Sequence, residues 1–196
     1  MDEKSKMTPG KITGQIIVRM ENLSESQRRA ELACLRSSIG KTLAEADDVW
    51  PIFFKYLPHE YLSENGVETA EEKAILTVLE FYAVCMQGAK HGVISDTGFR
   101  GSIGKSLASI RDPEDSSAID RRFNAMITAS TFMELTYHLR QLIKIARSKD
   151  GVTVNFARLA DDLFFYQLGD GKKTRMQWAK DYYSRPYKDE AADTDL

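Results

Sequence analysis

Apolar residues recur every three or four positions along much of this chain, behind signals for the start of a helix. Three segments begin with a hydroxyl residue followed three positions later by an acid or amide, the pattern of a capping box: Ser24 with Gln27, Thr69 with Glu72, and Thr131 with Glu134. Behind them, apolar residues keep to one helical face: Leu32, Leu35 and Ile39, then Ile75, Leu76, Leu79 and Val84, then Leu135, Leu139, Leu142 and Ala146. These patterns predict three amphipathic helices.

Shorter repeats predict additional helices, and no segment has a convincing strand pattern. The additional helices are expected within residues 11–21, 46–56, 102–110, 116–129, 155–167 and 172–184. Gly, Pro and Asp residues predict turns at Gly40 and within 58–66, 91–101, 111–114, 149–151 and 169–171. The predicted fold class is therefore all-α, a helical bundle of about nine helices in two small lobes.

The boundary between the two lobes is expected near Pro113. The N-terminal helical lobe is then residues 11–113, and the C-terminal four-helix lobe is residues 114–187. Residues 1–10 and the acidic tail 188–196 are expected to be disordered, because chain ends become ordered only where contacts hold them. A chain of 196 residues, 42% of them hydrophobic, is long enough to bury a core.

The hydrophobic pattern argues against a membrane protein. No run approaches the roughly 20 consecutive apolar residues that a transmembrane helix needs. The first residues are polar where a signal peptide would turn apolar. We therefore expect a cytoplasmic protein with no membrane partner. Cys34 and Cys85 stand in separate apolar stretches and are expected to be reduced core residues.

The charge of the chain is unevenly distributed. The formal net charge of -2 argues against a protein that coats DNA in general. However, residues 41–80 contain nine acids and three bases, whereas residues 81–111 contain one acid against Lys90, Arg100, Lys105 and Arg111. Part of the surface can therefore be basic although the whole protein is mildly acidic.

Motifs for catalysis and metal binding are incomplete. Two segments contain Gly-Lys followed by Thr or Ser, as in a nucleotide-binding P-loop, but Leu35 and Phe99 stand where its first glycine is required. The three histidines, His59, His91 and His138, have no metal-ligand spacing. The pairs at 47–48 and 161–162 are adjacent aspartates that project about 100° apart on a helix, so solvation or pairing with an arginine is favoured. We expect no cofactor, no metal and no enzyme activity; a catalytic site built from distant residues stays an alternative.

Basic residues recur at helical spacing. Arg140, Lys144 and Arg147 follow the spacing i, i+4, i+7, which places them on one side of a helix. The pairs 121–122 and 172–173 lie near expected helix starts, where positive charge opposes the helix dipole and is not explained by stability. Such stripes can contact phosphates, although an ordinary solvated face is the commoner use of Lys and Arg.

Several segments, taken in order, carry a family resemblance. They are residues 29–36, 101–108 and 119–127, followed by 138–143, 155–163, a turn containing Gly-Lys-Lys, and 178–183. Together they resemble the CasB family, the small subunit of the type I-E CRISPR Cascade complex. The resemblance spans most of residues 28–184.

The resemblance implies a two-lobed helical subunit without catalytic activity, present in two copies in a guide-RNA complex. Its basic surface would hold the displaced non-target strand and support the hybrid of crRNA and target DNA, while base pairing supplies the sequence specificity. The implied partners are the backbone and large Cascade subunits, a second copy of the chain, the crRNA–target DNA hybrid and the displaced DNA strand. The implied function is antiviral defence. The acidic tail is not part of the family pattern.

Ten residues are candidates for nucleic-acid binding. Motif by motif, the resemblance assigns this role to Arg36, Lys105, Arg121, Arg122, Arg140, Lys172 and Lys173. Proximity and spacing add Lys41, Arg111 and Lys144.

Two other classes of protein remain alternatives. A helix-turn-helix DNA-binding regulator would also be small, helical and locally basic, but no short helix pair with a tight turn and a polar recognition face is evident. A small helical enzyme would show turnover or a bound cofactor. The C-terminal aromatic residues Tyr166, Trp178, Tyr182 and Tyr183 could stack on bases, but their helical spacing favours packing between helices.

Overall fold

Helices form most of the regular structure in the computed structural model, which describes residues 7–87, 94–96, 98–112 and 114–184. The α-helices are α1 (Pro9–Glu21), α2 (Glu25–Ser37), α3 (Trp50–Phe53), α4 (Ala70–Cys85), α5 (Ile103–Ala108), α6 (Ser117–Ile127), α7 (Phe132–Arg147), α8 (Phe156–Phe165) and α9 (Gly171–Tyr183). Short 3-10 turns are η1 (Leu43–Glu45), η2 (Asp47–Val49) and η3 (His59–Tyr61), and a π turn, η4 (Tyr166–Asp170), joins α8 to α9. The all-α prediction is confirmed.

Hydroxyl side chains cap the three amphipathic helices that the sequence predicts, α2, α4 and α7. At α4 the capping box is reciprocal, since Thr69 Oγ1 accepts from the amide of Glu72 and the Glu72 carboxylate accepts from the amide of Thr69. At α7 the Glu134 carboxylate instead accepts from the amide of Ser130, one residue before the N-cap. The local signal therefore places the helix starts correctly.

One local prediction was only partly right, and one feature was missed. The helix expected within 46–56 is a 3-10 turn followed by the four-residue α3. Pro51 explains the difference, because proline is tolerated in the first turn of a helix but would disrupt the interior of one that began at residue 46. The missed feature is a pair of two-residue parallel strands, β1 (Ile94–Ser95) and β2 (Thr153–Val154), which are too short for an alternating pattern to show.

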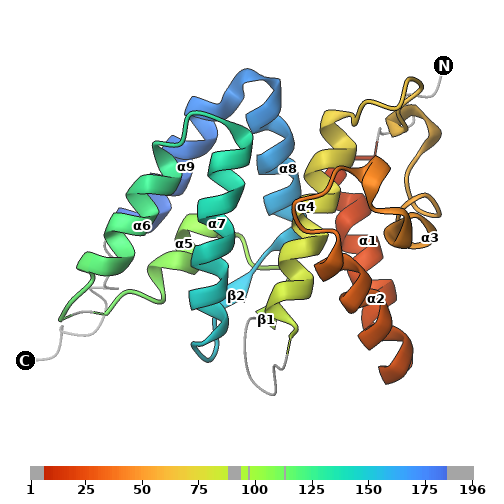
Figure 1. The fold of residues 1–196 in the computed structure, drawn as a ribbon. Coiled ribbons are helices and arrows are strands. Elements are labelled where there is room, and N and C mark those ends of the chain that lie inside the picture. The colour runs from red at the N-terminus through yellow and green to blue at the C-terminus, as the bar shows by residue number, and fades with distance from the viewer. Residues whose placement is uncertain (1–6, 88–93, 97, 113, 185–196) are drawn as a thin grey trace, which may run out of the picture.

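Helix α4 lies at the centre of the fold (Figure 1). It packs against α1 and α8, and α2 and α7 contact it as well. Its buried residues point in all directions around its axis: Glu72, Ala74, Ile75, Leu76, Val78, Leu79, Glu80, Phe81, Tyr82, Ala83, Val84 and Cys85. A helix that is apolar nearly all round is expected in a core. The buried Cys85 fits the expectation for that cysteine.

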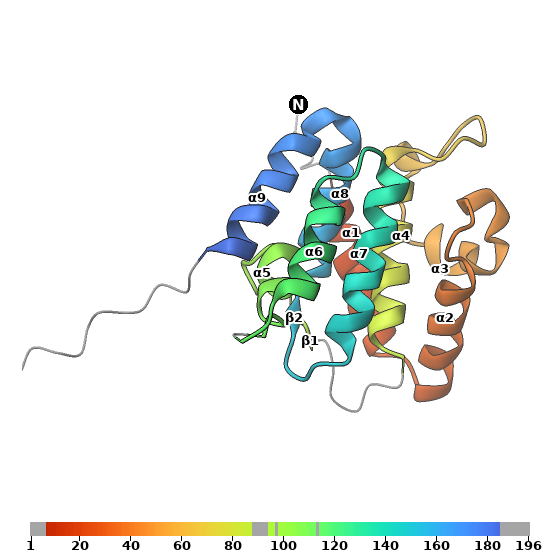
Figure 2. The same cartoon turned by 60° about the vertical axis from the view of Figure 1, so that its left-hand side comes forward.

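Helices α5, α6 and α9 form a second group beside α7. Helix α5 packs on α9 and α6 packs on α7, as the turned view shows (Figure 2). Trp178 and Tyr182 of α9 are fully buried, and the Tyr182 ring stacks on Phe123 with centroids 3.7 Å apart. The core role predicted for these two aromatic residues is confirmed.

Helices from both sides of the expected lobe boundary share one apolar core. Helix α1 contacts α8, and α5 contacts α9. Pro113, residues 1–6 and the tail 188–196 lie outside the described residues, so the lobe division and the disorder of the chain ends stay predictions. Helix α1 begins at Pro9, two residues before the expected start, because Thr8 caps it.

The two aspartates at 161–162 connect α8 to α1 and α9. Asp161 accepts a 2.7 Å hydrogen bond from the amide of Gly10 at the start of α1. Asp162 accepts a 2.7 Å hydrogen bond from the indole of Trp178 and lies 4.0 Å from the guanidinium of Arg158. Both aspartates therefore have a structural role. The ion pair with an arginine that the sequence predicts as one possible role is formed only by Asp162.

Close packing of α5 on α9 leads to a stability prediction. A Cβ at Gly104 would lie 2.0 Å from the carbonyl oxygen of Trp178, whereas a Cβ at Gly14 in α1 would lie 3.7 Å from the Cβ of Ala157, an ordinary contact. Gly104→Ala is therefore expected to lower the free energy of unfolding by about 1–3 kcal/mol, and Gly14→Ala to raise it by up to about 1 kcal/mol. Urea unfolding of both variants checks this, and equal effects would contradict the packing.

Candidate nucleic-acid interface

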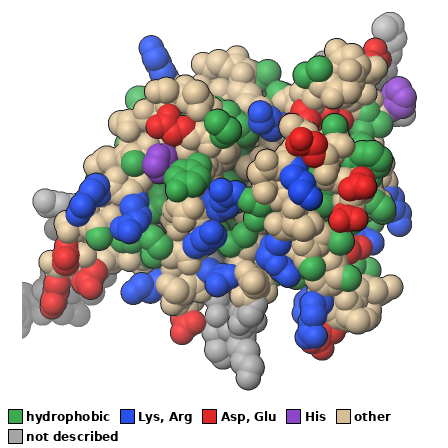
Figure 3. Space-filling model, in the orientation of Figure 1, with side chains coloured by type: hydrophobic (Ala, Val, Ile, Leu, Met, Phe, Trp, Pro, Cys, Tyr) green, Lys and Arg blue, Asp and Glu red, His purple; other side chains and the backbone are tan. Residues whose placement is uncertain are grey.

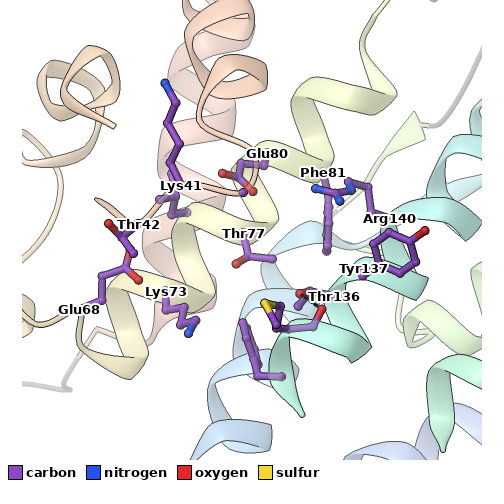
Figure 4. Close-up of a pocket in the computed structure, with 14 residues that line it drawn as sticks. Lys41, Thr42, Glu68, Lys73, Thr77, Glu80, Phe81, Thr136, Tyr137 and Arg140 are labelled. Atoms are coloured by element: carbon purple, nitrogen blue, oxygen red, sulfur yellow. Dashed lines mark hydrogen bonds between the residues drawn. The ribbon is translucent and has the colours of Figure 1, made fainter. Parts of the chain in front are cut away.

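A groove of about 400 Å³ lies between α4, α7 and the loop that follows α2. It is lined by Gly40, Lys41, Thr42, Glu68, Lys73, Leu76, Thr77, Glu80, Phe81, Phe132, Met133, Thr136, Tyr137 and Arg140. Figure 4 shows Lys41 and Thr42 on one side of the groove and Tyr137 and Arg140 of α7 on the other. Segments distant in the sequence therefore build this groove together.

Three bases line the groove. They are Lys41, Lys73 and Arg140, and none of them forms an ion pair with an acid among the described residues. The Lys73 ammonium lies 5.2 Å from the centroid of the Phe132 ring, and the Arg140 guanidinium lies 5.9 Å from that of Tyr137. Cation–π contacts of this kind orient a positive charge without neutralising it.

Two acids also line the groove, and one of them is largely shielded from water. Glu80 is 8% exposed. Ser38 Oγ lies 2.9 Å both from Glu80 Oε1 and from the carbonyl oxygen of Leu35. Because a hydroxyl has one proton, Ser38 donates to one of these two acceptors at a time. Glu68, by contrast, accepts a hydrogen bond from the amide of Leu43.

Burial changes the charge of Glu80. It raises the pKa of the Glu80 carboxyl to about 7, although the hydrogen bond with Ser38 and the positive charge of Arg140 oppose the rise. Near neutral pH a large fraction of Glu80 is uncharged. The three bases that line the groove outnumber its two acids, so the groove is net positive, and protonation of Glu80 makes it more positive.

Two arginines extend the positive charge along α4. Arg36 of α2 donates to the carbonyl oxygen of Ala83 at 3.3 Å, and Arg147 of α7 donates to that of Val84 at 3.3 Å. Both charges lie at the C-terminal end of α4, where the helix dipole favours positive charge. Lys144 is exposed on α7 between Arg140 and Arg147. We call these bases the α2–α4–α7 strip: Arg36, Lys41, Lys73, Arg140, Lys144 and Arg147.

Figure 3 shows Lys and Arg side chains gathered in a band across the middle of this face, whereas many acidic side chains lie toward its edges. The structure thus brings together four of the ten candidate residues, Arg36, Lys41, Arg140 and Lys144. Sequence reasoning left Lys73 and Arg147 out of the candidate set. Lys73 directly follows two acids, so its sequence context gives no signal for a basic site, whereas the helical spacing of Arg147 from Arg140 was a usable signal.

The other six candidates lie on α5, α6 and α9 and, in the case of Arg111, three residues after the end of α5. Lys105, Arg121, Arg122, Lys172 and Lys173 are exposed. No described contact joins them to the α2–α4–α7 strip, and in Figure 1 α5, α6 and α9 lie on the other side of α7. Their role in nucleic-acid binding stays a prediction.

Arg111 differs from the other candidates because it has an internal partner. Its guanidinium donates to both carboxylate oxygens of Asp120, at 3.0 and 3.2 Å, and lies 5.0 Å from the Tyr182 ring centroid. Burial opposes ionisation of Asp120, but hydrogen bonds from Tyr182, Ser116 and Arg111 outweigh it and lower the pKa of Asp120. The charge of Arg111 is therefore compensated within the protein, and it joins α5, α6 and α9.

Within the part of the chain that the structure describes, no group of three or more His, Cys, Asp or Glu side chains is placed to hold a metal ion. Among the same residues, no helix is long and apolar enough to cross a membrane. The fold and the strip define a small helical protein with a basic surface groove.

The comparison with protein families identifies this class more closely. The family model for CRISPR-associated protein Cse2 matches residues 31–183. The chain therefore belongs to the Cse2 family of CRISPR Cascade proteins, which confirms the resemblance seen in the sequence motifs. A search of curated proteins found no match.

Solved structures share the fold. CasB from Thermobifida fusca has a TM-score of 0.71 at 21% identity, over 90% of this chain and 98% of that one. CasB from Thermus thermophilus has a TM-score of 0.64 at 20% identity, over 90% and 99%. CasB from M. ruber has a TM-score of 0.62 at 18% identity, over 88% and 92%. At these identities the likeness concerns the fold alone.

Proposed function

We propose that this chain is the non-catalytic small subunit of a cytoplasmic type I-E CRISPR Cascade complex. In this role it binds nucleic acid without sequence specificity and stabilises the R-loop, in which crRNA pairs with one DNA strand and displaces the other. The observation that carries the proposal is the α2–α4–α7 strip in a chain of the Cse2 family. Expected partners are the other Cascade subunits and a second copy of the chain.

The chemistry of the strip fits a strand that another component selects. Lys and Arg contact phosphates of any sequence, and such contacts weaken as salt rises. Base pairing with the guide supplies the specificity in a complex of this kind. Tyr137, which is 52% exposed beside Arg140, offers a ring on which an unpaired base can stack. A strand held in this way cannot readily return to its complement.

The local extent of the strip predicts weak binding by the isolated chain. Its net charge is -2, so we expect a Kd on the order of 10⁻⁴–10⁻⁶ M for single-stranded DNA at physiological salt, as for other non-specific binding. Two unrelated sequences are expected to bind equally. Fluorescence anisotropy measures this binding directly.

Inside the complex, the proposed function predicts that this subunit lengthens the lifetime of the R-loop. Cascade assembled without this subunit is expected to release the displaced strand and collapse its R-loop faster than the complete complex. Tight, sequence-selective binding by the isolated chain, or an R-loop lifetime that does not depend on the subunit, would contradict the proposed function.

A further inference from the structure

A second groove, of about 310 Å³, lies on the side of α4 that faces η1 and α3. It is lined by Leu43, Ala44, Trp50, Phe54, Leu62, Ser63, Gly66, Glu68 and Glu72. We call it the Trp50 groove. Only Glu68 lines both this groove and the basic one, so the two surfaces are neighbours with different chemistry.

Large apolar side chains are exposed at the Trp50 groove. Trp50 is 39% exposed and Phe54 is 42% exposed, and their ring centroids lie 6.0 Å apart. Val67, next to the lining residues Gly66 and Glu68, is 69% exposed. Clustered apolar side chains of this size on a surface mark an interaction site more often than isolated ones do.

The groove is already formed in the isolated chain. The indole N–H of Trp50 donates to the carbonyl oxygen of Leu43 at 2.8 Å, which fixes the orientation of the ring. Among the other lining residues, the Glu72 carboxylate accepts from the amide of Ser63 at 3.1 Å. These hydrogen bonds order the groove before a partner binds, so little conformational entropy is lost on binding.

The surroundings of the Trp50 groove are acidic. Residues 43–69 contain six acids and one lysine. Asp47, Asp48, Glu60 and Glu64 are exposed, and none of them forms an ion pair among the described residues. Asp48 stands two residues before Trp50, and Glu64 directly follows the lining residue Ser63, so we call these four acids the rim of the groove. The rim repels phosphates and the acidic tail of this chain, and it attracts lysine and arginine.

We infer that the Trp50 groove docks a segment of another protein that carries an apolar anchor side chain flanked by lysine or arginine. The anchor packs between Trp50 and Phe54, and its basic neighbours lie against the acidic rim. This combination of a desolvated apolar centre and a charged rim is the common anatomy of protein interfaces. The surface is separate from the nucleic-acid strip, so both partners can be bound together.

The tryptophans provide a direct readout of docking. The chain has two, and Trp178 is fully buried while Trp50 is exposed. The probe is a synthetic amphipathic peptide of leucine and lysine, compared with one in which every lysine is glutamate. We expect the lysine peptide to shift the tryptophan emission to shorter wavelength, and Trp50→Phe to abolish the shift.

Two charge-matched variants test the site. Asp48→Lys with Glu64→Lys reverses two rim acids, whereas Glu114→Lys with Asp150→Lys reverses two exposed acids outside the groove. We expect the rim variant to weaken peptide binding by at least about fivefold and the control variant to change it little. Equal binding by the two variants, or equal binding of the lysine and glutamate peptides, would overturn the inference. Neither result depends on Cascade or on nucleic acid, so the proposed function is tested separately.

Discussion

Reversing four bases of the strip to glutamate is expected to weaken target-DNA binding by the assembled complex and to flatten its salt dependence. The variant carries Lys41→Glu, Lys73→Glu, Arg140→Glu and Lys144→Glu. Each lost phosphate contact lowers the log–log salt slope by about 0.7–0.9, so four contacts lower it by about 3. The loss is expected for all target sequences alike, because phosphates carry no sequence information.

A matched control keeps the overall charge change the same. It carries Lys11→Glu, Arg29→Glu, Lys55→Glu and Lys180→Glu, all at exposed positions outside the strip. Both variants are expected to fold, since every substituted position except the half-buried Arg140 is exposed, and exposed substitutions usually change stability by about 0.5 kcal/mol or less. A salt series of target binding distinguishes them, with incorporation into the complex checked in parallel. If both variants bind with the same affinity and slope, the strip is only a solvated face.

The exposed bases of the second group require a variant of their own. They are Lys105, Arg121, Arg122, Lys172 and Lys173. We propose that they contact a different stretch of nucleic acid from the strip, because α7 separates the two groups. The same salt series applied to their charge-reversal variant measures how many phosphate contacts they contribute.

Glu80→Gln is expected to stabilise the protein at alkaline pH and to leave it almost unchanged at acid pH. The pKa of Glu80 is about 7 in the folded protein, raised from 4.5. Below pH 4.5 the carboxyl is neutral in both the folded and the unfolded state and costs nothing. As pH rises from 4.5 to 7, the unfolded state loses its proton first, so the folded state loses stability relative to it. Above pH 7 the resulting decrease in the free energy of unfolding approaches about 3 kcal/mol.

Glutamine removes this loss because it stays neutral and its carbonyl still accepts from Ser38. Urea unfolding at pH 4.5, 6 and 8 measures the difference between Glu80→Gln and the natural chain, which is expected to grow toward alkaline pH. Glu64→Gln, at an exposed position, serves as the control. A difference that stays constant with pH would show that Glu80 ionises freely in the folded protein.

Much of the helical architecture was predictable because its signals are local. The capping residues Ser24, Thr69 and Thr131 mark helix starts from contacts within one turn, and the apolar faces behind them become buried. The hydrophobic pattern alone was not sufficient at Pro51. It favours a long helix there, but the proline restricts the helix to the four residues of α3.

The site was less predictable because its parts come from distant segments. Lys73 joins the groove only because α7, about 60 residues later, packs beside α4. Arg111 was a reasonable candidate from its proximity to Lys105, but its partner Asp120 becomes its neighbour only when α6 folds back. The acidic pair at 161–162 likewise acquires its role from Gly10 and Trp178, far away in the chain.

Affinity purification of the tagged full-length chain from its native host, followed by identification of the bound protein and RNA, tests the central claim most directly. Membership of the Cse2 family and the basic strip predict that the chain co-purifies with the large and backbone Cascade subunits and with RNA carrying CRISPR repeat sequence. Recovery of the chain alone on one specific DNA sequence, as for a helix-turn-helix regulator, would contradict the account.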